Sequence, residues 1–255
     1  MSWPLPESPA ARLALAKAYP FPAPGHSYLF RNGAAQPLES GTSQAALFAG
    51  RLPVIGHGSN RSPEQLRRKF GTGAEIPVSR AWLRDYDVVY SAHVSQYGSI
   101  AANLQHSPGT VAEVYVTWLD QDQLSRMHET ELGGENYYYG RLNGVSLELE
   151  AGPEAALSGA NVYLSTRGCL AWDGGLLGLA PVGLAAVASK GRPHGALDQL
   201  GVLDLVRARH RPERGLDHHI LETIRDPAGR KALIAEMEAH AIPAEAPHFE
   251  ILKGP

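Results

Sequence analysis

Residues 54–66 read VIGHGSNRSPEQL, and the interpretation of the chain starts from this stretch. A short apolar run ends in Gly-His-Gly-Ser-Asn and passes directly into residues that favour the start of a helix. Ser62 suits the N-cap position and Pro63 the first helical position. Backbone N–H groups in such a turn lie at the positive end of the helix dipole, a geometry that binds carboxylates, phosphates and oxyanions. We therefore expect a strand, an anion-binding turn and a helix, in that order.

The overall composition is that of an ordinary globular protein. Of the 255 residues, 44% are hydrophobic and 19% are charged, and the formal net charge is −3. No run of basic residues predicts a nucleic-acid surface, and we expect Arg67, Arg68 and Lys69 to form a solvated helix face. The single cysteine, Cys169, rules out an internal disulfide framework and favours a reducing compartment. We expect neither a secretory signal nor a membrane segment, and hence a soluble cytoplasmic protein.

Three regions of the chain differ in character. Residues 1–50 begin with six prolines among the first 25 residues and predict a Pro-rich arm and lead-in. Residues 51–167 carry mostly strand signals with two helices between them and form the predicted core. Residues 168–255 predict a Gly-rich connection and C-terminal helices packed on that core. The fold class expected from this order is α+β: a mixed, mostly antiparallel sheet closing into a small barrel, flanked by helices, with an extra helical C-terminal region.

Turn and cap residues predict several element boundaries. Ser-Pro-Gly-Thr at residues 107–110 and Asn-Gly at residues 143–144 each lie between two strand-like runs and predict hairpins. Asp120 and Gln123 form a capping-box pattern that opens a helix to about Leu132. The helices expected in the C-terminal region span residues 196–209, 216–225 and 227–240.

Three motifs in order resemble the γ-glutamylcyclotransferase-like superfamily. Gly58-Ser59-Asn60 is similar to the Tyr-Gly-Ser-Asn signature of that family, with His57 in place of Tyr. The segments AANLQHSPG (101–109) and VYV (114–116) resemble the hairpin that follows the signature. The segment LSRMHETE (124–131) is similar to the short helix that ends in the catalytic Glu, and YYYGR (137–141) to the strand after it.

The resemblance, over residues 52–166, implies an activity and a set of site residues. Enzymes of this family let the α-amine of a γ-glutamyl amide attack its own γ-carbonyl, which releases 5-oxoproline and an amine. Carried onto this sequence, the resemblance makes Glu131 the general acid/base. The substrate-binding residues that it implies are His57, Gly58, Ser59, Asn60, Tyr138 and Tyr139. If the register shifts after the helix, Glu129 or Glu135 takes the catalytic position instead.

The chemistry accounts for these residue types. The α-carboxylate needs hydrogen-bond donors, which the turn supplies, and the α-ammonium needs a base, because only the free amine is nucleophilic. We expect a partly apolar pocket to raise the pKa of Glu131 toward the working pH. We also expect Glu131 on a different wall from the turn, without touching it, beside at least one of Tyr137, Tyr138 and Tyr139.

Two other functions stay open at this point. The same fold acts on a carboxylated urea in the related C-terminal domain of allophanate hydrolases, so another small amide is one alternative. The other is a non-catalytic small-molecule binder or assembly protein that docks through its C-terminal helices. No metal or cofactor is expected, since the adjacent His218 and His219 do not face one another on a helix. The expected partner is a small molecule with a free α-amino acid group, and a homodimer is left open.

Overall fold

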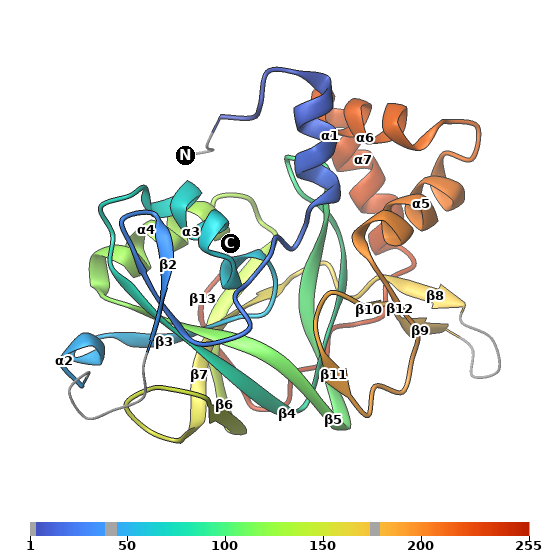
Figure 1. Ribbon diagram of the computed structural model, residues 1–255. Helices are drawn as coiled ribbons and strands as arrows, with labels where there is room; N and C mark the ends of the chain where they lie inside the picture. The colour runs from blue at the N-terminus through green and yellow to red at the C-terminus, as the bar shows by residue number, and fades with distance from the viewer. Residues whose placement is uncertain (1–3, 39–44, 174–178, 255) are drawn as a thin grey trace.

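The computed structural model describes residues 4–38, 45–173 and 179–254, and its centre is a closed barrel of five strands (Figure 1). The five are β3 (Leu52–Gly56), β4 (Ile76–Val94), β5 (Ile100–Leu119), β6 (Tyr137–Leu149) and β7 (Ala156–Ser165). Strand β5 pairs antiparallel with β3 and β4, β6 pairs antiparallel with β4 and β7, and β3 closes the ring by pairing parallel with β7. The predicted fold class, a mostly antiparallel mixed sheet closed into a barrel with added helices, is confirmed.

The hairpin predicted at residues 107–110 is wrong, because these residues lie inside the continuous strand β5. Gly109 has a φ of 80°, and Tyr86 of β4 faces both His106 and Val111. The residues between those two partners therefore bulge out of the ladder while the strand keeps its direction.

The hairpin predicted at Asn143-Gly144 is wrong for the same reason. Gly144 has a φ of 63°, and the register of β6 against β7 shifts between Asn143 and Leu147. The chain reverses only after β6, between residues 150 and 155, where it turns into β7. A turn-forming Gly has thus produced a bulge in each of two long strands.

Local signals predict the helix starts around the barrel opening correctly. The helices there are η2 (Ser59–Arg61, a short 3-10 turn), α3 (Pro63–Phe70) and α4 (Gln121–Glu131). The Ser62 hydroxyl caps α3 by accepting from the Glu64 N–H, and Asp120 with Gln123 forms the predicted capping box of α4. These caps satisfy backbone donors that a helix start leaves without partners.

In its described residues, the C-terminal region adds small strands and three helices to one side of the barrel (Figure 1). Its strands are β8 (Ala171–Asp173), β9 (Leu179–Pro181), β10 (Gly183–Leu184), β11 (Ser189–Lys190), β12 (Ala196–Leu197) and β13 (Phe249–Lys253). Its helices are α5 (Gln199–His210), α6 (Leu216–Arg225) and α7 (Pro227–Glu238). Strand β13 pairs with β6, so the last described segment returns to the barrel. Residues 174–178 of the predicted Gly-rich connection lie outside the described residues.

The N-terminal segment takes part in the fold at two places. Its elements are α1 (Pro9–Lys17), β1 (Tyr28–Arg31), β2 (Ala34–Pro37) and α2 (Ala45–Phe48). Strand β1 pairs with β4 and so extends the barrel sheet, while α1 lies beside α6, to which Lys17 is ion-paired through Asp217 (Figure 1). The segment therefore bridges the barrel and the C-terminal helices.

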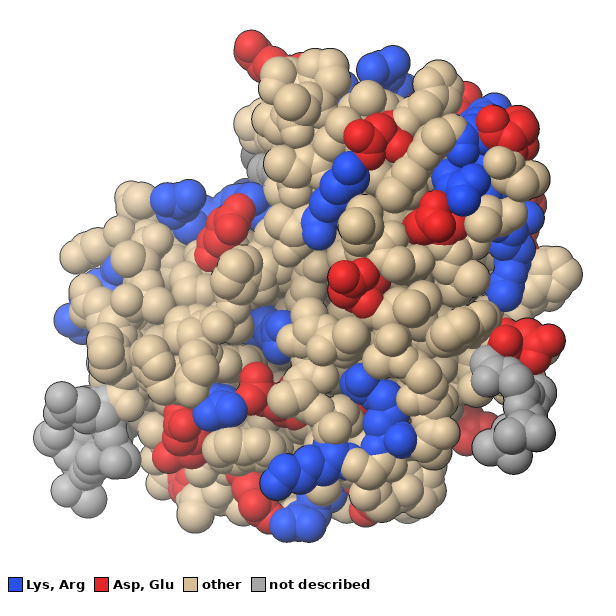
Figure 2. All heavy atoms as spheres, turned by 45° about the vertical axis from the view of Figure 1, so that its right-hand side comes forward, with Lys and Arg blue, Asp and Glu red and all other residues tan. Residues whose placement is uncertain are grey.

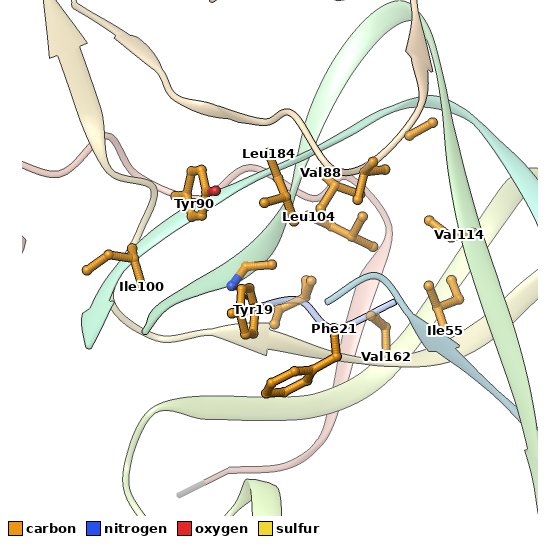
Figure 3. Close-up of a cluster of buried hydrophobic side chains, with 14 of the residues drawn as sticks. Tyr19, Phe21, Ile55, Val88, Tyr90, Ile100, Leu104, Val114, Val162 and Leu184 are labelled. Atoms are coloured by element: carbon orange, nitrogen blue, oxygen red, sulfur yellow. Dashed lines mark hydrogen bonds between the residues drawn. The ribbon is translucent and has the colours of Figure 1, made fainter. Parts of the chain in front are cut away.

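The main core draws side chains from all three regions. In Figure 3, Tyr19 and Phe21 of the N-terminal segment lie among Ile55 and Val162 of the barrel, with Leu184 of β10 in the same cluster. Phe21 is only 2% exposed. Burying apolar surface from segments so far apart in the chain stabilises their relative arrangement.

On the face drawn in Figure 2, Lys and Arg side chains are interspersed with Asp and Glu instead of gathering into a patch of one sign. Within the described ranges, no helix is long and apolar enough to cross a membrane.

Candidate functional site

The turn between β3 and α3 is fixed by a close approach of the N-terminal segment. A Cβ atom on Gly58 would overlap the hydroxyl oxygen of Tyr19, so this position accepts only glycine without rearrangement. The same hydroxyl accepts a hydrogen bond from the N–H of Ala102 on β5, at 2.7 Å. Tyr19 thus holds the turn against the barrel.

The backbone of the turn keeps unused donors. The N–H groups of Arg61 and Ser62 donate to the carbonyls of Gly58 and Ser59. Across residues 4–38, 45–173 and 179–254, no acceptor is present for the N–H groups of Gly58, Ser59 and Asn60. A turn with unpaired N–H donors, followed by a capped helix, has the chemistry of an anion-binding site.

Glu131, the last residue of α4, lies beside this turn. Its Oε1 accepts a hydrogen bond from Asn60 Nδ2 at 3.0 Å and forms an ion pair with Lys69 Nζ from α3. The side chains of Lys69 and Glu131 are 3% and 14% exposed. The expectation that Glu131 would stand apart from the turn is wrong, because the Asn60 side chain joins them.

The electrostatics of Glu131 also differ from the expectation. Burial raises the pKa of its carboxyl group. The charge and hydrogen bond of Lys69, with smaller effects of Asn60 and His57, lower that pKa by more than burial raises it. The net result is a pKa below the ordinary value, so the predicted upward shift is wrong. Its cause is Lys69, a buried residue that the sequence pattern placed on a solvated face.

His57 is a neutral residue near neutral pH. Burial lowers its pKa to about 4, against smaller opposing effects of a hydrogen bond with the backbone of Ala102 and of the Glu131 charge. Its Nδ1 is buried and has no hydrogen-bond partner among the described residues. Near neutral pH this imidazole is uncharged, so the charge that lowers the pKa of Glu131 there comes from Lys69.

A cavity of about 360 Å³ opens onto Glu131. Its walls come from the turn, α3, the end of β4, the end of α4, the start of β6, helix α7 and the N-terminal segment. The lining residues with polar or aromatic side chains include Tyr19, Ser59, Gln65, Lys69, His93, Glu131, Tyr137 and Arg230. Ser59 of the turn therefore shares the cavity with Glu131, whereas the other predicted turn residues, His57, Gly58 and Asn60, are not among its lining residues. Two of the cavity walls, α7 and the N-terminal segment, lie outside the predicted core of residues 51–167.

Comparisons with known proteins give only a limited result. No family model matches the chain, and no curated protein does. Three solved structures are similar over 46% of this chain: a γ-glutamyl cyclotransferase at 18% identity, a protein from Arabidopsis thaliana at 16% and an uncharacterised human protein at 19%. The chain covers 67%, 70% and 68% of them, with TM-scores of 0.36, 0.35 and 0.35. One of the three thus bears the name of the family that the motifs resemble.

The tyrosines divide between cavity and packing. Tyr137 lines the cavity, and its ring contacts that of His93 edge to face. Tyr139 packs instead against His128, with ring centroids 4.5 Å apart, and against Tyr163. Tyr138 points to the opposite face of the strand, as the two-residue period of β6 requires. Neither Tyr138 nor Tyr139, the two predicted substrate-binding tyrosines, lines the cavity.

The three cavity residues with basic side chains, Lys69, His93 and Arg230, were not predicted. One signal was present for Lys69, because Gln65 and Lys69 are four residues apart and share a face of α3. Nothing comparable pointed to His93 on a strand or to Arg230 on a distant helix. These two residues are brought to the site by tertiary packing alone.

Other reactive residues lie away from this cavity. Cys169 is buried, its Sγ donates to Gln105 Oε1, and burial raises the pKa of its thiol to about 12. In the part of the chain that the structure describes, no group of three or more His, Cys, Asp and Glu side chains has an arrangement that could hold a metal ion.

Proposed function

We propose that this protein is a γ-glutamylcyclotransferase-like enzyme that cleaves a γ-glutamyl amide to 5-oxoproline and an amine. The observation that carries the proposal is the hydrogen bond from Asn60 of the turn to Glu131, which lines the cavity together with Ser59. It supports a site in which the anion-binding turn and the acid/base group act on the same small molecule. The motif order in the sequence supplies the reaction class.

The reaction divides between positioning and proton transfer. With the α-carboxylate at the Gly58–Asn60 turn, the α-ammonium lies near Glu131 and transfers one proton to it. The amine nitrogen then forms a bond to the γ-carbonyl carbon, and the bond from that carbon to the leaving nitrogen breaks. Glu131 passes this proton to the leaving nitrogen, and the second proton that the attacking nitrogen loses on ring closure reaches the released amine by the same carboxylate. The amine therefore leaves as an ammonium ion, and no water is consumed. Because the reaction is intramolecular, much of the acceleration comes from holding the folded substrate conformer.

The structure supports Glu131 over the two neighbouring carboxylates. Glu129 lines the cavity but is ion-paired with Arg126 on the same helix, and its side chain is mostly exposed. Glu135 is exposed and does not line the cavity. Of the three, only Glu131 is both buried and bonded to the turn. We therefore propose Glu131, and neither Glu129 nor Glu135, as the acid/base group.

Replacing Glu131 with Gln is the direct test. We expect 5-oxoproline release from a γ-glutamyl amide to fall about 10²–10⁴-fold, since a positioned acid/base contributes on that order. The amide oxygen of the new side chain still accepts from Asn60 and Lys69, so the protein stays folded. Release is measured by chromatography beside a thermal unfolding curve, with Glu135→Gln as the matched control. A loss of activity that parallels a loss of folded protein would contradict a chemical role.

A second reaction is kept because of one departure from the family pattern. His57, buried and neutral, stands where the family has Tyr, which changes a residue of the turn. The alternative substrate is a carboxylated urea or another small amide. A panel that contains γ-glutamyl amides and carboxylated ureas separates the two, and consumption of only the ureas would overturn the cyclotransferase proposal. A non-catalytic binder is not favoured. Such a protein has no need of a carboxylate beside the turn, whereas Glu131 is only 14% exposed and accepts a hydrogen bond from Asn60.

A further inference from the structure

A second cavity, of about 390 Å³, shares Tyr19 with the cavity at Glu131. Its walls come from residues 18–25 of the N-terminal segment, from Arg61 at the end of η2, from β5 and from Ala186. The reaction proposed above takes place in the first cavity and makes no use of the second. The second cavity therefore calls for an explanation of its own.

The side chain of Arg61 is a buried cation in the wall of this cavity. Arg61 is only 5% exposed, and it forms no ion pair with any residue that the structure describes. Its Nη2 donates to the carbonyl of Ala186 at 2.8 Å, whereas its Nε is buried without a partner. Burial lowers the pKa of the guanidinium, but arginine stays protonated at neutral pH. Because a buried charge without a counterion is costly, this wall favours an anionic ligand.

Glu113 is the one carboxylate among the described residues that line the second cavity. Its Oε2 accepts hydrogen bonds from both Nε and Nη2 of Arg80, with which it forms an ion pair. The nearby hydroxyl of Tyr115 is also engaged, since it donates to the carbonyl of Pro24. Arg80 thus compensates the charge of Glu113, and the charge of Arg61 is left for a ligand.

The rest of the wall is largely apolar. Pro20, Phe21, Pro22 and Ala23 follow one another along the N-terminal segment and all line the cavity. The volume lies in the range of cavities that hold small organic molecules. A single guanidinium pairs well with the two oxygens of a carboxylate, whereas a phosphate has more acceptor oxygens than one arginine can satisfy. The wall therefore suits an organic acid with an apolar body.

We propose that the second cavity binds a small organic carboxylate. The carboxylate group contacts the guanidinium of Arg61, and the apolar body lies against Pro20 and Pro22. This site is separate from Glu131 and does not depend on the proposed reaction. It gives a role to a buried charge that the barrel fold itself does not need.

The test compares three probes at pH 7: benzoate, the uncharged benzamide of the same shape, and inorganic phosphate. Binding to the full-length protein is measured by calorimetry. We expect benzoate to bind about 10- to 100-fold more tightly than benzamide, from the strength of hydrogen bonds to charged groups. Benzoate that binds no more tightly than benzamide, or more weakly than phosphate, would overturn the proposal.

Variants show which cavity holds the probe. Arg61→Gln is expected to abolish the preference for benzoate over benzamide, whereas Lys69→Met, in the wall of the first cavity, should keep it. The exposed Arg67 of α3 provides the matched control, because Arg67→Gln should leave the preference unchanged. A preference that survives Arg61→Gln and disappears in Lys69→Met would place benzoate in the first cavity and refute the second site.

A measurement on the unaltered protein covers the case in which Arg61→Gln does not fold. Crystals are grown with 4-bromobenzoate, and the bromine is located by its anomalous scattering. We expect a bromine position in the second cavity, with the carboxylate turned toward Arg61. Bromine found only in the first cavity or on the outer surface, or at no ordered position, would refute the site.

Discussion

At the scale of single residues, the site depends on the contact between Gly58 and Tyr19. The Tyr19 hydroxyl occupies the space that a Cβ on Gly58 would need, and it satisfies the buried N–H of Ala102. A residue outside the barrel therefore sets the shape of the anion-binding turn. The contact with Tyr19 is the reason why position 58 has no room for a Cβ atom.

The pair can be examined by a double-mutant cycle. We expect Gly58→Ala to cost about 1–3 kcal/mol of unfolding free energy through overpacking, and Tyr19→Phe about 1–3 kcal/mol through the unsatisfied Ala102 N–H. Combined, they should cost less than the sum, because Tyr19→Phe removes the hydroxyl oxygen that the new methyl group meets. Urea unfolding measures all four proteins. Simple additivity would show that the two residues do not interact.

At the scale of elements, the sequence predicted what is local and missed what is not. The capping box of Asp120 and the cap of Ser62 act within a few residues, so α4 and α3 were predicted with their starts. Gly109 and Gly144 carry the same local turn signal as a hairpin. Long-range pairing of β5 with β4, and of β6 with β7, decided that both form bulges.

The candidate site divides in the same way. Short motifs predict the turn and Glu131. The burial of Lys69 follows instead from the packing of α3 against α4, which no short motif indicates. Helix α7 was predicted as a helix, but its contribution to the cavity was not. The periodicity of a helix does not indicate which distant part of the chain its buried face will contact.

Helix α7 yields a prediction through Arg230. Arg230 lines the cavity and donates to the carbonyl of Thr223 at the end of α6, and it takes part in no ion pair with another described residue. We expect Arg230→Gln to lower kcat/KM for γ-glutamylglycine by a few-fold, equivalent to about 1 kcal/mol, because the leaving amine carries a carboxylate. With γ-glutamylmethylamide, whose leaving amine has no carboxylate, kcat/KM should stay unchanged. Equal losses for the two amides would place Arg230 in a structural role.

At the scale of the whole molecule, the three regions of the chain share one core and one cavity. Phe21, Val162 and Leu184 come from the three regions and lie in one buried cluster (Figure 3). We propose that the arm, the barrel and the C-terminal helices form a single cooperative unit. In such a unit, a change in the charge of any buried group alters the stability of the whole.

Three buried histidines contribute to the pH dependence of stability. Burial lowers the pKa of His57, His93 and His219 to about 4, from an ordinary value of 6.5. The unfolded chain thus binds more protons between these values, so the free energy of unfolding falls as the pH drops from 6.5 to 4. We expect His219→Gln to make this fall shallower, with the exposed neighbour His218→Gln as control. Urea unfolding at several pH values measures both, and identical slopes for the two variants would contradict the assignment.

The contribution of α7 to the cavity wall has a consequence for synthesis of the protein. The turn and Glu131 emerge from the ribosome while residues 227–238 have yet to be translated. A nascent chain therefore has the proposed catalytic carboxylate well before it has a closed binding site, because domains acquire long-range contacts only as the chain lengthens. The protein therefore becomes able to bind its ligand only late in its synthesis. We expect ribosome-bound chains that stop before α7 to be inactive.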